Sequence, residues 1–339
     1  MMTPTHDRYA RQSILPHVGT HGQAQLSRSC ALVVGAGALG SPVLQYLVGA
    51  GVGHLIIVDP DVVQLSNLHR QPLHDEGQLG LFKVHSAVER LHALNSTIRL
   101  TPHAVALTPD NAPDWVAQAD VVLDCADSFA VSYTLSDECH RQGKAYISAS
   151  VLGMSGYVGG FCQRAPSLRA VFPQIPAQAT TCSEAGVMGP VAATLGSIQA
   201  QMALVVLLGQ QPSPLGLMVS VDLSSYEFRR FRFDLASEPD GVDYPFIGRT
   251  SISLDDCVID LRSADESAEL CVPHATRVLP YEWEQWLCAY LSQSARRDAQ
   301  RLILACRSGL RAWRAADAAR AHWSGPIHLF AVGESPPTA

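Results

Sequence analysis

Three glycines, Gly35, Gly37 and Gly40, form a Gly-x-Gly-x-x-Gly pattern in the segment GAGALG. The pattern follows a short apolar run, residues 29–34, and opens an expected helix over about 41–51. Such glycines let a phosphate approach backbone N–H groups at the positive end of a helix. The pattern therefore predicts a nucleotide site, and by itself it leaves two alternatives open: NAD as the nucleotide, or a glycine turn without any ligand.

Asp59 ends the next apolar run, at the separation expected for a carboxylate that accepts hydrogen bonds from ribose hydroxyls. Four amide and cationic side chains follow it in the segments LSNLHRQ and GLFK: Asn67, Arg70, Gln71 and Lys83. A dehydrogenase has no evident need for such a cluster, whereas Arg and Lys neutralise triphosphates and stabilise a pyrophosphate leaving group. The cluster favours ATP over NAD; the alternative is ordinary surface ion pairs.

A carboxylate, Asp127, lies just past the apolar run 121–124, where a central strand is expected to end. Magnesium prefers carboxylate and phosphate oxygens as ligands. We therefore expect Asp127 to hold Mg²⁺ beside the triphosphate.

The first part of the chain alternates strand-like and helix-like segments. Strands are expected near 29–34, 54–58, 98–104 and 121–124, and helices near 41–51, 81–94 and 188–208. This order is typical of βαβ units around a parallel sheet covered on both faces. Residues 217–223 and 226–233 read as antiparallel strands. The prediction for residues 1–234 is an α/β fold, a Rossmann-like doubly wound, mostly parallel sheet with an antiparallel extension.

A change in composition separates this part from a second one. Residues 235–250 are rich in Ser, Glu, Pro, Asp and Gly and are predicted to be a linker. Residues 251–339 start a new α/β pattern, with strands near 257–261, 301–305 and 327–330 and helices near 281–291 and 311–323.

The sequence motifs of the first part resemble the ThiF/MoeB/HesA family, bacterial relatives of ubiquitin-activating enzymes. The resemblance runs from residue 8 to about 209 and rests on RYARQ, GAGALGSPV, VDPDVVQLSNLHRQ, GLFKV, LDCAD and TCSEAGVMGP. It implies an adenylyltransferase that is a homodimer, in which Arg11 enters the ATP site of the partner. It also implies nucleotide or metal roles for Asp59, Asn67, Arg70, Gln71, Lys83 and Asp127.

Two features depart from the family pattern. Ser128 and Ser132 stand where the family usually has Asn and Arg after the metal-binding Asp. Relatives also commonly carry two Cys-x-x-Cys pairs that bind structural zinc, for which four thiolates are suited. Here residues 167–170 read SLRA, residues 235–241 read LASEPDG, and no Cys-x-x-Cys occurs in the chain. We therefore predict that no zinc is bound.

Two cysteines are candidates for covalent chemistry. Cys182, in TCSEAG, lies in a loop that in the resembled family crosses the active site, where its Cys can bond to the activated substrate; the alternative is a buried structural cysteine. Cys306, in CRSGLR, follows an expected strand and precedes an expected helix. Backbone N–H groups, two arginines and the helix dipole would favour its thiolate or persulfide.

The segment around Cys306, together with the CVIDLR segment at 257–262, resembles a rhodanese domain. The resemblance covers about 251–333 and implies a small rhodanese-like α/β domain with sulfurtransferase activity. The alternative is an inactive dimerisation module.

Composition narrows the possible partners. The 339-residue chain has a formal net charge of −7 and no long basic block, which argues against nucleic acid. The N-terminal segment lacks the layout of a secretory signal, the apolar stretches look too short to span a membrane, and nine cysteines fit free thiols. A cytoplasmic protein is expected. None of the thirteen histidines has the spacing of a metal ligand.

Together these features predict ATP-dependent adenylation of the C-terminal carboxylate of a ubiquitin-like sulfur carrier ending in Gly-Gly, followed by sulfur transfer from a Cys306 persulfide loaded by a persulfide donor. Two alternatives remain: adenylation of a peptide or protein without sulfur transfer, and a nucleotide-binding scaffold without catalysis.

Overall fold

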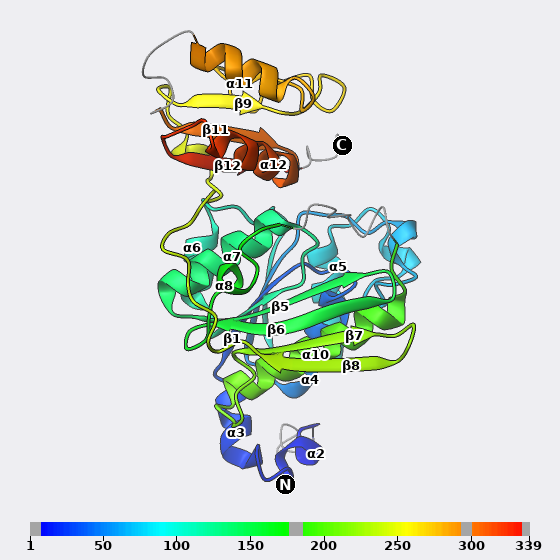
Figure 1. The fold of residues 1–339 in the computed structure, drawn as a ribbon. Helices are drawn as coiled ribbons and strands as arrows, with labels where there is room; N and C mark the ends of the chain where they lie inside the picture. The colour runs from blue at the N-terminus through cyan, green and yellow to red at the C-terminus, as the bar shows by residue number, and fades with distance from the viewer. Residues whose placement is uncertain (1–7, 176–185, 293–299, 334–339) are drawn as a thin grey trace.

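A computed structural model describes residues 8–175, 186–292 and 300–333, which form a large unit and a smaller one (Figure 1). The large unit is built on an eight-stranded sheet with the order β3-β2-β1-β4-β5-β6-β7-β8. Its strands are β1 (Cys30–Val34), β2 (His54–Val58), β3 (Arg99–His103), β4 (Val121–Asp124), β5 (Ala145–Leu152), β6 (Ser155–Cys162), β7 (Leu217–Asp222) and β8 (Glu227–Arg232). Strands β3 to β5 are parallel and β5 to β8 antiparallel, which confirms the predicted sheet.

Helices cover both faces of this sheet. They are α2 (Ala10–Ser13), α3 (Gly19–Leu26), α4 (Gly40–Ala50), α5 (Lys83–Leu94), α6 (Ala112–Gln118), α7 (Phe129–Gln142), α8 (Leu168–Val171) and α10 (Gly189–Leu207), with short 3₁₀ turns η1 (Leu65–Asn67), η2 (Glu76–Gln78) and η3 (Arg249–Ser251). Because side chains alternate along a strand, Ala31 and Val33 pack with α4, α5 and α10, whereas Leu32 and Val34 pack with α6 and α7.

The helix predicted near 188–208 is α10, Gly189–Leu207. Among the described residues it is the one helix whose length and hydropathy would allow it to cross a membrane. Half of its apolar window is buried inside the protein, where it packs against α4, β5 and β6. This packing is that of a core helix.

The smaller unit contains a four-stranded parallel sheet, β10-β9-β11-β12. Its elements are β9 (Cys257–Asp260), β10 (Thr276–Arg277), α11 (Trp283–Ser292), β11 (Leu302–Cys306), α12 (Leu310–Arg320) and β12 (Ile327–Ala331). This is the small α/β architecture that the sequence predicts for the C-terminal part.

The two units share one hydrophobic cluster. It contains Ala130 and Tyr133 of α7 together with Trp313 of α12 and most of the core beneath β9 and β11. Within the predicted linker, Phe246 forms a β-bridge with Leu329 of β12, so this stretch packs as part of the smaller unit. Helix α7 therefore forms part of the surface on which the smaller unit rests.

Candidate functional site

The glycine turn packs against the end of β4. Gly35 has a φ of +100°, and a Cβ added there would lie 2.6 Å from the carbonyl oxygen of Cys125. A Cβ added at Gly40 would lie 2.0 Å from the oxygen of Gly35. Both positions require glycine, which holds the turn closed at the N-terminus of α4, where backbone N–H groups can receive a phosphate.

Asp59 fixes this turn from the end of β2. Its Oδ2 accepts a hydrogen bond from Ala36 N at 2.7 Å and its Oδ1 from Asp61 N at 2.8 Å. Burial raises the pKa of Asp59 above its usual value, although the charge of Lys83 and the two backbone hydrogen bonds act in the opposite direction. A carboxylate has about four lone-pair sites, so Asp59 can still accept from a ribose hydroxyl.

Lys83 lies at the start of α5 and is buried. Its Nζ donates to Oδ2 of Asp61 at 2.7 Å. An ammonium has three donors, so this bond leaves two for phosphate oxygens. The sequence motifs do not single out Asp61, although it is a second acid only two residues after Asp59.

Gln71 places an amide beside the glycine turn. The residue is 4% exposed, and its Nε2 lies 3.4 Å from where a Cβ of Gly37 would be. Its Oε1 is buried without a hydrogen-bond partner. A buried acceptor without a partner costs about 1–3 kcal/mol, and a ligand hydroxyl or amine would satisfy it.

Asn67 and Arg70 belong to the same turn. Asn67 is buried, and its carbonyl oxygen accepts from Arg70 N and Gln71 N. The Arg70 guanidinium donates to Ser66 O at 2.9 Å. The structure therefore places Asp59 and Gln71 against the glycine turn and joins Lys83 to Asp59 through Asp61. Asn67 and Arg70 are held by hydrogen bonds within their own turn.

Asp127 is exposed in the loop between β4 and α7. Beneath it, the buried Asp124 carboxylate accepts from Ser132 Oγ (2.6 Å), Tyr146 Oη (2.7 Å), Ser148 Oγ (3.1 Å) and Ala126 N (3.1 Å). These bonds fix the loop that carries Asp127. Ser132, one of the departures from the family pattern, is thus a support for this loop.

Asp127 could serve as one ligand of a magnesium ion that also binds the phosphates of ATP. Within the described residues, no group of three or more His, Cys, Asp or Glu side chains could form a metal cage. Mg²⁺ commonly uses one or two carboxylates plus phosphate oxygens and water. An exposed carboxylate near the glycine turn fits that requirement.

Arg11 lies at the opposite end of the large unit. Its neighbours Tyr9 and Gln12 contact Gly51 and Ala50 at the C-terminal end of α4, whereas the glycine turn is at the N-terminal end. The 11 residues of α4 span about 16 Å. Arg11 is exposed and is separated from the nucleotide turn of its own chain.

Cys306 ends β11, and its sulfur lies at the centre of the following loop. Sγ accepts from Gly309 N at 3.2 Å and from Ala312 N at 3.4 Å, and the residue is fully buried. Gly309, with φ +85°, immediately precedes α12 and packs against Phe246 and Ala130. The predicted backbone cradle around the sulfur is therefore present, and α7 covers one side of it.

The loop arginine Arg311 is engaged by an acid. Arg311 forms a two-point ion pair with Glu266, and the hydrogen bond from Arg311 lowers the pKa of Glu266 to about 2. Nearby, Asp260 accepts from the Arg262 guanidinium and from Cys271 N. Burial works to raise the pKa of Asp260, but these hydrogen bonds lower it below its usual value.

Two further sequence expectations concern loops of the large unit. Cys182 lies outside the described residues. Where the first cysteine pair of relatives would be, Ser167 N and Oγ both donate to the carboxylate of Glu238, each at 2.6 Å. The two segments expected to be joined by zinc in relatives are thus joined here by direct hydrogen bonds.

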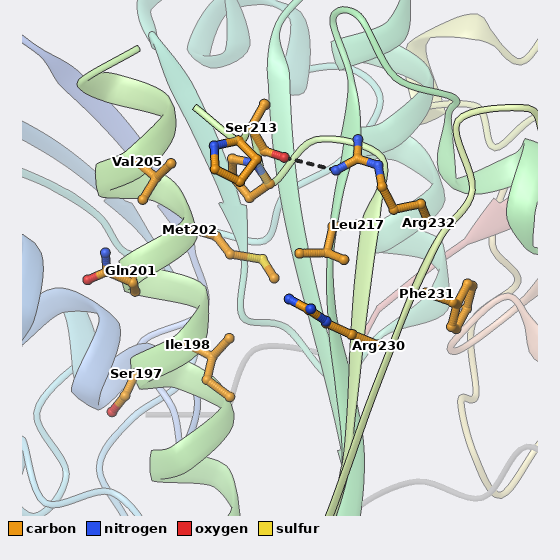
Figure 2. Close-up of a pocket in the computed structure, with 12 residues that line it drawn as sticks. Ser197, Ile198, Gln201, Met202, Val205, Ser213, Leu217, Arg230, Phe231 and Arg232 are labelled. Atoms are coloured by element: carbon orange, nitrogen blue, oxygen red, sulfur yellow. Dashed lines mark hydrogen bonds between the residues drawn. The ribbon is translucent and has the colours of Figure 1, made fainter. Parts of the chain in front are cut away.

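A groove of about 730 Å³ lies elsewhere, between α10 and strands β7 and β8. Figure 2 shows Arg230 extending from β8 toward Ile198 and Met202 of α10, and Arg232 donating to Ser213 O. None of the residues lining the groove is among the predicted nucleotide or sulfur residues.

The sequence of the large unit is similar to a known protein family and to several curated proteins. A model of the ThiF family matches residues 9–241. The chain is 43% identical over 233 residues to the adenylyltransferase and sulfurtransferase MOCS3 of Sus scrofa, covering 66% of this chain and 50% of that protein. It is 39% identical over 247 residues to the adenylyltransferase and sulfurtransferase uba4 of Aspergillus fumigatus, covering 68% and 50%. The matched part spans about half the length of these curated relatives.

Solved structures share the fold of the large unit. E. coli MccB with ATP superposes with a TM-score of 0.59 at 19% identity, covering 67% of this chain and 72% of that one. PaaA gives a TM-score of 0.59 at 18% identity, covering 68% and 74%. At this identity the similarity concerns the fold alone.

Proposed function

Because the chain belongs to the ThiF family, we propose that it adenylates the C-terminal carboxylate of a ubiquitin-like sulfur carrier and then transfers sulfur from Cys306. The observation that carries this proposal is the arrangement at the end of the parallel strands. There Asp59 and Gln71 lie against the glycine turn, Lys83 is joined to Asp59 through Asp61, and the turn packs on Cys125 and Ala126, just before the exposed Asp127. The names of the curated relatives, adenylyltransferase and sulfurtransferase, support both steps.

In the first step a carboxylate oxygen of the carrier attacks the α-phosphorus of ATP. The new bond joins that oxygen to phosphorus, and the bond from the α-phosphorus to the bridging oxygen breaks, so pyrophosphate leaves with the electron pair. The glycine turn and Lys83 bind the phosphates and offset the charge that builds up on the leaving group. Mg²⁺ held by Asp127 would neutralise phosphate charge.

In the second step the terminal sulfur of a Cys306 persulfide attacks the carbonyl carbon of the acyl-adenylate. A carbon–sulfur bond forms, the carbon–oxygen bond breaks and AMP leaves with the electron pair, giving an acyl disulfide on Cys306. Two equivalents of a thiol reductant then release the thiocarboxylate and the free Cys306 thiol, and they become oxidised to a disulfide. A persulfide donor or thiosulfate reloads Cys306. Gly309 N and Ala312 N hold the sulfur during these steps.

The proposal includes a homodimer. Helix α10 begins beside Arg70, near Gly189, and ends beside α3, where Gln25 donates to Leu207 O at 2.6 Å. A two-fold axis that pairs the two α10 helices antiparallel would bring the Arg11 end of one copy to the Arg70 end of the other. The groove beside α10 would then face the second copy. A cytoplasmic location remains part of the proposal.

ATP–pyrophosphate exchange with a recombinant ubiquitin-like carrier ending in Gly-Gly tests adenylation. Mass spectrometry of the carrier tests sulfur transfer, since a thiocarboxylate adds about 16 Da. Arg11→Ala and Lys83→Met chains, each of low activity alone, should regain exchange when co-purified as a mixed dimer. Absence of exchange in the native protein with every carrier tried would contradict the proposal.

The complete burial of Cys306 favours one alternative, adenylation of a peptide or protein without sulfur transfer. In that case exchange would occur while no thiocarboxylate formed and no sulfur moved from thiosulfate to cyanide.

A further inference from the structure

His74 is a buried histidine for which the sequence patterns indicate no role. It lies between the turn carrying Gln71 and helix α5, and it is 5% exposed. Its Nε2 is 2.9 Å from Ala36 O, and its Nδ1 is 2.6 Å from Ser86 Oγ. Both ring nitrogens are therefore engaged inside the protein.

The partners of His74 determine where its proton is. A carbonyl oxygen only accepts, so Nε2 carries the hydrogen and donates to Ala36 O. In the neutral ring Nδ1 then accepts, and the Ser86 hydroxyl donates to it. Ser86 Oγ also donates to Gln78 Oε1 at 2.7 Å, so its single hydrogen alternates between Gln78 and His74.

Ala36 is consequently held from both sides. Its N–H donates to Asp59 and its C=O accepts from His74. Ala36 stands between Gly35 and Gly37, the most mobile residue type in an unfolded chain. Two buried hydrogen bonds on the intervening residue fix the orientation of the turn before any phosphate arrives, which lowers the entropy cost of binding.

The same side chain joins the glycine turn to α5. Ser86 lies three residues after Lys83, one helical turn along α5. The contact series Ala36–His74–Ser86 therefore connects the backbone that would receive the phosphates to the helix whose first residue supplies the cation. The charged groups that act on the ring are Lys83 and Asp75.

We infer that His74 is a positioning residue of the nucleotide site, which holds the glycine turn in its phosphate-binding orientation through the Ala36 carbonyl. The inference rests on the proposed ATP site and adds a residue to it. His74 contacts neither the phosphates nor the carrier; it acts through Ala36 and, by way of Ser86, through α5.

Three substitutions separate the two hydrogen bonds of the ring. Gln places an N–H near the position of Nε2 and keeps the bond to Ala36 O, Asn reaches only toward Ser86, and Phe keeps the volume and loses both bonds. We expect His74→Phe and His74→Asn to raise the dissociation constant for Mg–ATP about tenfold or more, the loss of one hydrogen bond in a buried site. His74→Gln should remain within about threefold of the native protein.

Binding is measured by calorimetry with Mg–ATP alone, without carrier, and exchange kinetics then give KM for ATP and kcat separately. The expected change is in KM with kcat nearly unchanged. His85→Phe, an exposed neighbour on α5, is the matched control and should bind ATP as the native protein does. Ser86→Ala tests the other side of the ring and should give an intermediate loss.

Equal ATP affinity in all His74 variants would overturn the inference, as would a loss with Gln as large as with Phe. A native protein that failed to bind Mg–ATP would instead contradict the proposed function. Should His74→Phe not fold, the comparison of Gln, Asn and Ser86→Ala decides the question, because each retains part of the polar contact.

Discussion

Arg169 of α8 and Trp313 of α12 form a contact between the two units, with the guanidinium 5.6 Å from the ring centroid. The same guanidinium lies 4.8 Å from the ring of Tyr133 and donates to both oxygens of Asp137 at 2.7 and 2.9 Å. Arg169 is 4% exposed. One buried cation is thus held by the large unit and presented to the smaller unit, whose Trp313 also packs on Tyr133.

Arg169→Gln should destabilise the protein by about 2–4 kcal/mol, because it leaves the Asp137 carboxylate without its cation and removes the contact with two rings. Urea unfolding followed by tryptophan fluorescence measures this. Arg229→Gln is the control: Arg229 also pairs with an acid, Glu227, but both side chains are well exposed on β8, so the unfolding midpoint should not move. If the two substitutions changed the unfolding midpoint equally, the buried contacts of Arg169 would not be what stabilises the protein.

Gly309→Ala should destabilise the smaller unit by about 1–3 kcal/mol. The residue has φ +85°, and its new Cβ would lie 2.5 Å from the Phe246 ring. Gly49→Ala, at an exposed position inside α4 with no atom near its Cβ, should be neutral or stabilising by up to about 1 kcal/mol. Thermal unfolding of both variants checks this, and a tolerated alanine at position 309 would argue against the tight contact.

Lys83→Met should reduce ATP–pyrophosphate exchange by about a hundredfold or more, the scale of losing one preorganised electrostatic contact. Arg28→Met, which removes an exposed cation far from the glycine turn, should retain exchange. If Lys83→Met kept full exchange, the triphosphate would have to be neutralised by other residues.

Cys306→Ser should abolish sulfur transfer from thiosulfate to cyanide, because a hydroxyl cannot carry the persulfide. Cys288→Ser is the control, since Cys288 is an exposed cysteine of the same unit. The rate of cyanide-dependent thiocyanate formation gives the answer. If Cys306→Ser transferred sulfur at the native rate, another cysteine would have to carry the persulfide.

Stability should fall in acid partly through His74. Burial is the main cause that lowers the pKa of His74 below 6.5, opposed by the hydrogen bond to Ala36 and aided by Lys83. The unfolded chain then binds a proton more readily than the folded one, so this contribution is complete above about pH 6.5 and decreases as the pH falls toward the folded-state pKa. The difference in unfolding free energy between native and His74→Gln protein, measured from pH 8 to 5, should shrink or reverse below that pH. If this free-energy difference stayed constant from pH 8 to 5, the pKa of His74 would not be lowered in the folded protein.

Segments with a clear apolar pattern were predictable from the sequence, and their predicted ends lie close to the observed ones. The predicted helix over 41–51 is α4, Gly40–Ala50, and the strands expected at 217–223 and 226–233 are the antiparallel pair β7 and β8. Strands β5 and β6 and helix α7 were not predicted. β6 contains Gly156, Gly159 and Gly160, residues that weaken strand propensity but allow close packing, since a Cβ at Gly156 would lie 2.2 Å from Ser150 O.

The candidate site was predictable where a residue belongs to a short motif. Asp61, Asp124 and His74 were missed because their roles depend on contacts between segments far apart in the chain. Asp124 meets Tyr146 and Ser148 of β5, and His74 meets Ala36 of the glycine turn. A buried polar residue gives no periodic signal, so only the folded arrangement reveals its partners.

The contact between Ser167 and Glu238 is made entirely by oxygen and nitrogen atoms. Neither Ser167 nor Glu238 offers a thiolate that an oxidant could convert to a sulfenic acid. In a protein proposed to handle persulfide sulfur, these two loops therefore stay joined by atoms that sulfane sulfur does not modify.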